Sequence, residues 1–483
     1  MLFQRKKPLD LILETAEKRS LKRQLGAFDL TILGIGAVIG TGIFVLTSVA
    51  AQKAGPGMMY SFIIAAVVCA LTALIYAEIA SMVPVSGSAY TYSYAILGEI
   101  IAWMVGWALI LEYAVGNIAV AIAWSGYFSS LLSAFGIHLP DFLTHGYRTA
   151  LLSSNPEVHG LLQTAPRLAG IPILLNIPAF VIVMAITWLL YIGVKESVRA
   201  NNVMVVVKLL VLGLFIVLGA AHINPDNFVP FAPNGWRGIH QGAAIVFFAY
   251  IGFDAISTAA EETKNPQRNM PRGILLGLAV CTVIYVIVGI VATGLVPYQQ
   301  LRASDPLAEA LQLAGLPTAS AIVAFGAAVS LTAVLLVFQY GQPRIFFAMA
   351  RDGLLPQWAA RIHPRYRTPH VTTFVTGLVV AVGALFMDEN EIYDLTNIGT
   401  LSAFAIVCIG VLVLRTTDPE RPRPFRVPAL PLVSIAGAAA CFYVMLGLPR
   451  HAWERFGIWL VLGLAIYFAY GFSHSRLRAA GRQ

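Results

Sequence analysis

The sequence predicts an all-α membrane protein whose helices cross the bilayer twelve times. Hydrophobic residues make up 58% of the 483 residues, and charged residues make up 12%. A soluble protein has roughly 45–50% hydrophobic and about 25% charged residues. Twelve almost uncharged stretches follow one another along the chain, each close to the about 20 residues that a helix needs to cross a bilayer. This composition excludes a soluble fold. We therefore interpret the net charge of +8 in relation to the lipid bilayer and not as a sign of nucleic-acid binding.

The twelve expected spans form two sets of five and a final pair. Only Glu112, Lys208 and Asp254 bring a charge into them. The fourth and seventh stretches are longer than one crossing needs, so we expect their ends to lie in loops. In chain order the spans are 30–51, 57–77, 100–132, 168–194, 203–221, 243–260, 273–301, 317–343, 371–387, 395–414, 427–448 and 456–473.

The basic residues of the loops predict the orientation. With a cytoplasmic N-terminus, the inner segments hold 23 Lys and Arg residues and the outer loops hold seven. An excess of basic residues marks the cytoplasmic side, so both termini are expected there, in a multi-pass protein of the cell (inner) membrane. The first span begins near residue 30, too late for a cleaved signal peptide.

Two spans carry residues that interrupt a helix. The first contains four glycines within residues 34–42, each weakening a helix by roughly 1 kcal/mol relative to alanine. Close helix packing is the alternative explanation, because small residues also allow that in membranes. The sixth span contains Gly252 and Asp254. Because each of these spans opens a set of five, they indicate an inverted-repeat transporter with its substrate at the breaks.

Helix geometry places the two interruptions at a similar depth. At about 1.5 Å per residue, Gly40 lies roughly 17 Å from the inner start of its span and Phe248 roughly 14 Å from the outer start of its own. The two meet near the midplane of a core about 30 Å thick. The expected organisation is a cytoplasmic segment 1–28, a first repeat 29–222, a second repeat 239–415, two further helices in 427–473 and a cytoplasmic tail 474–483.

Two facing breaks predict a zwitterionic ligand. The freed N–H groups of an unwound helix attract an anion, and its freed carbonyl groups attract a cation. An α-amino acid presents both charges, whereas a sugar would need polar side chains that are almost absent here. The candidate substrate-binding residues are Gly40, Thr41, Gly42 and Ile43 at the first break and Phe248, Ala249 and Ile251 at the second.

Six segments together resemble one protein family. They are LGAFD at 25–29, GIGAVIGTGIF at 34–44, VPVSGSAYTY at 83–92, EETKNPQRNMPR at 261–272, GQPRIFFAMARDGLLP at 341–356 and RPFRVPALP at 423–431. With these segments the chain resembles the amino acid–polyamine–organocation superfamily, in the branch of cationic amino acid transporters and their bacterial relatives. The resemblance implies a five-plus-five inverted repeat with two added helices, and amino acid transport by alternating access. It also implies that Phe248 is an aromatic gate over the substrate, with ordinary packing as the alternative.

Three charged residues inside the spans are candidates for coupling and gating. Lys208 lies about 12 Å deep, and such a charge is expected to face the protein interior or water; snorkelling to the inner interface is the alternative. The resemblance implies that some relatives carry a lysine where sodium-coupled ones bind sodium. Because desolvation disfavours a charged lysine, we expect Lys208 to take up and release the coupled proton. Glu112 either assists proton passage, pairs with Lys208 or bonds a neighbouring helix, and Asp254 is a gate or packing residue.

The expected pocket favours small neutral substrates. Its eighth-span lining offers Ser330, Thr332, Phe338 and Gln339, without an acidic residue to hold a cationic side chain, and large aromatics leave little room. We therefore expect proton-coupled, sodium-independent uptake of L-amino acids such as alanine. Transport of arginine or lysine, amino acid exchange, ion transport and amino acid sensing remain alternatives.

The remaining features predict no further chemistry. The four cysteines, Cys69, Cys281, Cys408 and Cys441, lie within spans without ligand spacing, so we expect no metal and no cofactor. Intramembrane catalytic pairs are missing, and an enzyme is not expected. The expected partners are an L-amino acid, a proton and the lipid bilayer, with a small membrane accessory subunit left open. The outer segment 133–170 has no role that the sequence reveals.

Overall fold

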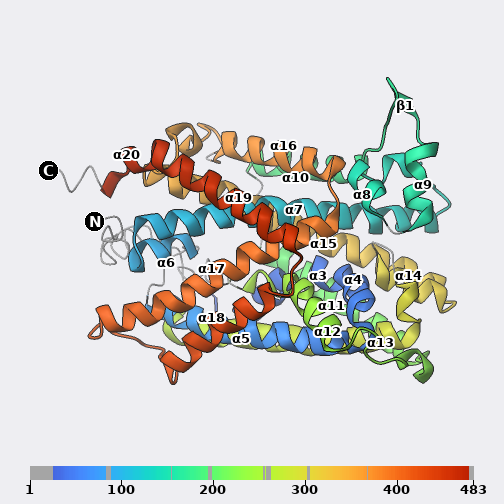
Figure 1. The fold of residues 1–483 in the computed structure, drawn as a ribbon, viewed down its shortest axis with the longest axis horizontal. Coiled ribbons are helices and arrows are strands. Elements are labelled where there is room, and N and C mark those ends of the chain that lie inside the picture. Colours follow the sequence, from blue (N-terminus) through green and yellow to red (C-terminus); the bar gives the residue numbers. More distant parts are fainter. Residues whose placement is uncertain are drawn as a thin grey trace.

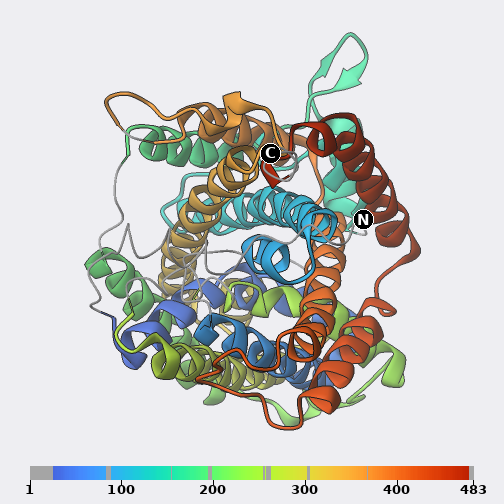
Figure 2. The same ribbon diagram turned by 90° about the vertical axis from the view of Figure 1, so that its left-hand side faces the viewer.

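The computed structural model describes residues 25–82, 89–153, 155–193, 198–253, 256, 263–301, 305–366 and 368–477. Most of its long helices run along the long axis (Figure 1). The view along that axis places α7 (Glu99–Ala134) near the middle of the bundle (Figure 2). Figure 1 shows α6 (Ala89–Ile96) and α20 (Phe472–His474) at one end and α8 (Tyr147–Leu152) and α9 (Pro156–Thr164) at the other.

The first half of the chain begins with an interrupted helix. Its pieces are α2 (Ala27–Val38), α3 (Thr41–Phe44) and α4 (Leu46–Ala54). A turn at Gly55, where φ is +61°, then separates α4 from the next helix. The elements that follow are α5 (Met58–Met82), α6, α7, the 3-10 turn Asp141–Leu143, α8, α9, the hairpin of β1 (Arg167–Leu168) and β2 (Ile171–Pro172), α10 (Ile177–Tyr191) and α11 (Val198–Ala220).

The second half begins with another interrupted helix. It consists of α12 (Gly235–Val246) and the 3-10 turn η5 (Phe247–Tyr250). The helices that follow are α13 (Pro266–Leu295), α14 (Pro306–Leu313), α15 (Pro317–Arg351), α16 (His370–Phe386), α17 (Glu389–Thr417), α18 (Leu430–Met445), α19 (Arg450–Ile466), a π-helical turn at Tyr467–Gly471 and α20. Short 3-10 turns lie at Tyr298–Gln300 and Gln357–Ala360 in this half, and at Gly55–Gly57 and Pro225–Phe228 before α12.

Every expected span contains helix in the described residues, and the membrane character of the chain is confirmed. Seven helical segments are long and apolar enough to cross a membrane, and four shorter apolar helices (α2, α10, α16 and α18) accompany them. Large side chains such as Leu210, Val217 and Val461 are about two-thirds exposed, at 67%, 68% and 67%. Such exposure is tolerated because a bilayer, unlike water, solvates apolar side chains.

The fourth expected span begins outside its helix, as its excess length predicted. Residues 167–172 form the β1–β2 hairpin, and α10 begins only at Ile177. The side chain of Asn176 accepts a hydrogen bond from Ala179 N at 3.2 Å and thereby caps the helix. Pro178 follows within the first turn, where its missing N–H costs nothing. Hydropathy alone could not see this boundary, because the hairpin is also uncharged apart from Arg167.

The segment between α7 and α10 is fastened to α16 and α17. Arg148 of α8 donates two hydrogen bonds to Glu391 of α17, at 2.8 and 2.9 Å, and Arg455 of α19 pairs with the same carboxylate. Asn176 N donates to Leu385 O at 3.1 Å. The segment, for which the sequence suggested no role, is therefore an ordered part of the bundle.

A buried carboxylate joins three parts of the chain near the end of α5. Glu78 is fully buried. Its Oε2 atom accepts hydrogen bonds from Arg415 of α17 at 2.6 Å and from Val427 N at 2.7 Å. A buried carboxylate is stable only when it is paired in this way, and the pairing fixes the proline-rich segment 423–431 between α17 and α18.

Candidate functional site

The first interruption lies at residues 39–40. α2 ends at Val38, and Ile39 (φ −73°, ψ 104°) and Gly40 (φ −158°, ψ −139°) are extended. An extended chain cannot continue the i to i−4 bonds of a helix, so the N–H groups of Thr41 and Gly42 at the start of α3 have no intrahelical acceptor. Ile43 N donates to Gly40 O at 3.2 Å, so within the described residues Gly40, Thr41 and Gly42 are the N–H groups of this break that could bind a ligand.

The second interruption follows α12. The helix tightens into η5, Ile251 turns to φ −60° and ψ 136°, and Gly252 has a φ of +111°. That φ suits glycine, and a Cβ atom at Gly252 would also lie 2.9 Å from Ala37 O. Backbone from α2 and from the second interruption therefore lie against each other here.

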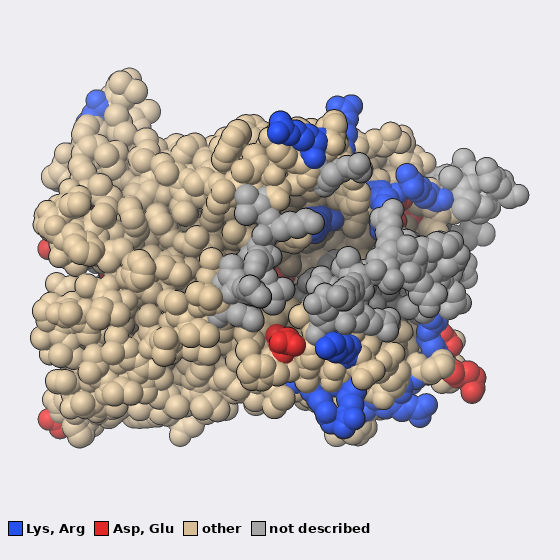
Figure 3. Space-filling view, turned by 180° about the vertical axis from the view of Figure 1, so that it is seen from behind, with Lys and Arg blue, Asp and Glu red and all other residues tan. Residues whose placement is uncertain are grey.

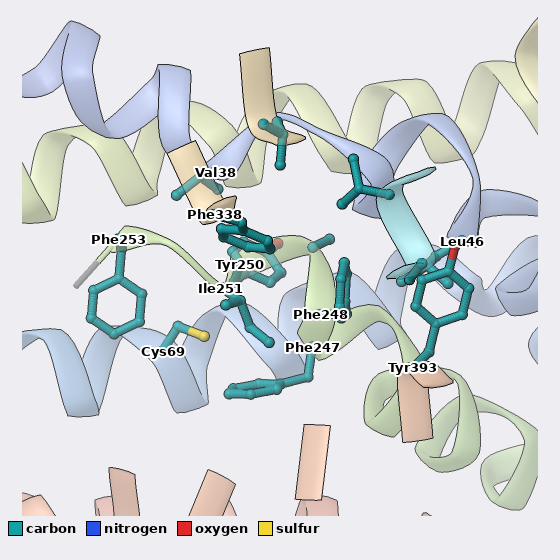
Figure 4. Close-up of a cluster of buried hydrophobic side chains, with 14 of the residues drawn as sticks. Val38, Leu46, Cys69, Phe247, Phe248, Tyr250, Ile251, Phe253, Phe338 and Tyr393 are labelled. Atoms are coloured by element: carbon teal, nitrogen blue, oxygen red, sulfur yellow. The ribbon is translucent and has the colours of Figure 1, made fainter. Parts of the chain in front are cut away.

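The two interruptions also touch at Gly42. A Cβ atom built there would overlap the Cα and Cβ atoms of Ala249 and lie 2.9 Å from Ala249 N. The hydroxyl oxygen of Tyr285, from α13, lies 2.9 Å from both Val38 O and Ala249 O. Because a phenol has one hydrogen, it donates to one of these carbonyls at a time. Figure 4 shows Val38, Tyr250, Ile251, Phe248 and Phe338 gathered at this junction.

Polar side chains at the first interruption meet the backbone or remain without partners. The Lys208 ammonium, 1% exposed on α11, donates to Gly36 O at 2.8 Å and to Ile39 O at 2.9 Å. In an unbroken helix these carbonyls would bond the N–H groups of residues 40 and 43, so the break supplies the acceptors. The Thr41 hydroxyl is 1% exposed and has no hydrogen-bond partner within the described chain.

Aromatic rings enclose the junction. Phe248 is 5% exposed and packs edge-to-face on Tyr393 of α17, with ring centroids 5.0 Å apart. Phe338 of α15 packs on Tyr113 of α7 at 5.5 Å, and its ring lies 3.2 Å from a Cβ atom built at Gly116. The breaks are therefore covered from two sides by rings.

Of the two acidic candidates, only Glu112 lies within the described residues. Glu112 is 4% exposed on α7, and its expected pairing with Lys208 stays a prediction. Asp254 lies outside the described residues.

Among the eighth-span candidates, Thr332 accepts a hydrogen bond from Trp124 Nε1 at 2.9 Å, and Gln339 donates to Val183 O of α10 at 3.3 Å. These two side chains therefore bond neighbouring helices.

Sequence reasoning missed two residues at the breaks. Tyr285 reaches both of them, and Asn397 of α17 donates from Nδ2 to Ala244 O at 2.8 Å and Ile245 O at 3.0 Å, capping the last turn of α12. In the sequence, the only feature that could have drawn attention to Tyr285 and Asn397 is a polar side chain within an apolar stretch. Which carbonyls they serve depends on helix packing, which one sequence does not show.

We expect Tyr285→Phe to weaken substrate binding about fivefold. Phenylalanine keeps the ring packed on Tyr250, 5.2 Å away, and removes only the hydroxyl between Val38 O and Ala249 O. One neutral hydrogen bond contributes about 1 kcal/mol, hence about fivefold in the Kd of a ligand bound at the junction. Tyr250→Phe is the matched control, because its hydroxyl donates to Phe62 O of α5 at 3.0 Å; equal effects of both variants would contradict a specific role for Tyr285.

An apolar helical bundle in which two interrupted helices meet at a buried junction is the architecture of a membrane transporter. The chain belongs to the amino acid permease family, whose model matches residues 25–467. The resemblance drawn from the sequence is thereby confirmed, and the family is one of transporters.

Similar proteins differ in the substrates that their names state. The chain is 48% identical over 477 residues to the branched-chain amino acid permease BcaP of Bacillus subtilis (strain 168), covering 99% of each chain. It is 47% identical over 475 residues to the methylthioribose transporter of the same organism, covering 98% of each. It is 40% identical over 409 residues to the vacuolar cationic amino acid transporter 4 of Arabidopsis thaliana, covering 83% of this chain and 64% of that one.

Proposed function

We propose that this permease takes up small neutral L-amino acids such as alanine, coupled to protons and independent of sodium. The observation that carries the proposal is the Lys208 ammonium bonded to Gly36 O and Ile39 O. A fixed cation on the carbonyls of the first break occupies the position that a bound metal cation would need. We propose that the ammonium releases a proton when these contacts open, so that the same group carries the coupled proton.

The substrate backbone is proposed to bind between the two breaks. Its carboxylate accepts hydrogen bonds from the N–H groups of Gly40, Thr41 and Gly42, and the Thr41 hydroxyl, which has no partner within the described residues, is a further donor. Its ammonium donates hydrogen bonds to carbonyl oxygens of the second break. Phe248 O already accepts Ile251 N at 3.2 Å, but a carbonyl has two lone pairs and can accept again.

We further propose twelve crossings, two inverted repeats of five helices and cytoplasmic termini. The interruptions after Val38 and Val246 support this, because each falls in the first helix of its set. The face seen in Figure 3 supports the orientation, because most of its Lys and Arg side chains lie in the half of the bundle that holds α6 and α20. On this view α8 and α9 lie outside the cell.

The side-chain pocket supports an apolar substrate. Phe248, Ile251 and Phe338 are buried at the junction, and none of them could pair with a cationic side chain. Branched-chain amino acids are the second candidate, favoured by the 48% identity with a permease named for them. Cationic substrates are less favoured, because the relatives that carry that name are 36–40% identical.

Uptake by purified protein in liposomes tests the proposal. We expect an inwardly directed proton gradient to drive accumulation of radiolabelled alanine, and a sodium gradient alone to drive none. Unlabelled leucine, arginine and methylthioribose compete in parallel assays. Stronger competition by leucine selects the branched-chain candidate, and stronger competition by arginine or methylthioribose rejects a small neutral substrate. Uptake that requires amino acid inside the liposome identifies an exchanger, and binding without flux identifies a sensor.

A further inference from the structure

One face of α17 carries three polar side chains with unpartnered oxygen atoms. Glu389, Tyr393 and Asn397 are spaced by four residues and therefore follow one another along the same side of the helix. Within the described residues, Glu389 Oε2, the Tyr393 hydroxyl and Asn397 Oδ1 are buried atoms without a hydrogen-bond partner. Tyr393 is 1% exposed and Asn397 is fully buried. Buried polar atoms without partners are rare, so three in one line require a common explanation.

The outer end of this line opens into a large cavity. Glu389 lines a cavity of about 840 Å³, together with Asp305, which precedes α14, and Asp388. The segment between α7 and α10 lines the cavity with His138, Asp141 and His145, and among the described residues neither Lys nor Arg lines it. A cavity of this size and charge holds water and attracts cations, protons included.

The inner end of the line lies at the second break. Asn397 uses both hydrogens of its amide on Ala244 O and Ile245 O, so its remaining oxygen can only accept. Tyr393 stands between Asn397 and Glu389, with its ring against Phe248; Figure 4 shows the two rings side by side. The line therefore connects the outer cavity with the backbone proposed to bind the substrate.

The spacing of the three side chains suits a chain of water molecules. Four residues of helix rise about 6 Å, which is close to two hydrogen bonds of about 2.8 Å in series. One water between Glu389 and Tyr393 and one between Tyr393 and Asn397 would give each unpartnered oxygen a partner.

We propose that this face of α17 is the route by which protons from the outer side reach the second break, with Glu389 as the outer proton acceptor and the Tyr393 hydroxyl as the relay. The proposal rests on the proposed proton coupling. Glu389 takes a proton from the cavity and passes it to the next water. Tyr393 then accepts a proton on its oxygen while its own hydrogen moves inward, so one proton enters, one leaves and no bond order changes. Asn397 holds the last water, and the proton that leaves this water is the one that Lys208 takes up where the two breaks meet.

The charges around Glu389 suit this task. Burial, then the neighbouring Asp388 and Asp305 carboxylates, raise the pKa of Glu389 to about 8. The other titratable groups of the cavity are His138, Asp141 and His145, while the nearby Arg148 is engaged by Glu391. Glu389 is thus mostly protonated at neutral pH and releases its proton as the outer pH rises through about 8, which matches a group that loads and unloads under working conditions.

The test measures alanine uptake by the full-length protein in liposomes at a series of outer pH values, with the pH difference across the membrane held constant. For the wild type we expect the proton-driven rate to fall as the outer pH rises through the titration of Glu389. Glu389→Gln should remove that fall and lower the driven rate severalfold. Tyr393→Phe keeps the ring on Phe248 and should lower the driven rate severalfold, while alanine counterflow at equal pH on both sides is retained.

Matched variants separate this route from general effects on the outer surface. Glu454→Gln removes an exposed outer carboxylate that pairs with Arg450 at 2.8 Å, and Tyr147→Phe removes the hydroxyl of an exposed tyrosine of α8; both should behave as the wild type. A proton-driven wild type whose pH profile both line variants keep overturns the route and leaves the proposed function standing. A wild type without proton-driven uptake overturns both. If Glu389→Gln does not fold, the result for Tyr393→Phe alone tests the route: an unchanged proton-driven rate in that variant overturns it.

Discussion

Lys208→Ala is expected to abolish accumulation of alanine driven by a proton gradient. The variant removes both hydrogen bonds to Gly36 O and Ile39 O. Bonds from a charged donor contribute roughly 1.5–3 kcal/mol each, so the first break also loses its main tie to α11. Lys208→Met keeps most of the apolar stem and removes only the charge, and it should lose proton-driven accumulation as well. The measurement is uptake of radiolabelled alanine into liposomes with an acidic exterior.

A lysine outside the site provides the comparison. Lys53→Ala removes the charge of an exposed lysine in the last turn of α4, and its proton-driven uptake should equal that of the wild type. Should Lys208→Met accumulate alanine as well as the wild type does, Lys208 is a structural residue and the coupling proposal fails. Thermal unfolding of each purified variant shows whether lost uptake reflects lost protein.

Gly42→Ala is expected to eliminate uptake of every substrate. Its methyl group would overlap the Cα and Cβ atoms of Ala249, and backbone cannot move aside as a flexible side chain can. The two interrupted helices must therefore separate, which also moves the N–H groups proposed to bind the carboxylate. Overpacking of this kind costs typically 1–3 kcal/mol, and at a binding site the displacement alone of about 1 Å can cost about a hundredfold in rate.

Gly213→Ala is the control for this variant. It places the same methyl group on α11, where nothing lies within 4 Å of the built Cβ atom, and alanine is the better helix former by about 1 kcal/mol. We expect full uptake and unchanged or slightly higher thermal stability. Normal uptake by Gly42→Ala would show that the two breaks need not touch during transport.

The fold was more predictable than the site. Uncharged runs locate the long helices because a helix must hide its backbone within itself in lipid, and the glycines at 40 and 42 revealed the first break. The same runs did not distinguish the β1–β2 hairpin, which is uncharged apart from Arg167, from the helix that follows it. Phe248 and Lys208 could be singled out by type and depth, whereas Tyr285 and Asn397 act through carbonyls of distant segments. No local pattern records such contacts, since they arise only when the helices pack.

The attachment of Glu391 to both Arg148 and Arg455 bears on how the molecule can be held from outside. The carboxylate of Glu391 ties both α8 and α19 to the first turn of α17, so these three elements are held together at one point. An antibody fragment raised against α8 would therefore bind a surface that is tied through Glu391 to α17 and α19. Such a fragment would enlarge the particle for imaging and mark one end of the bundle.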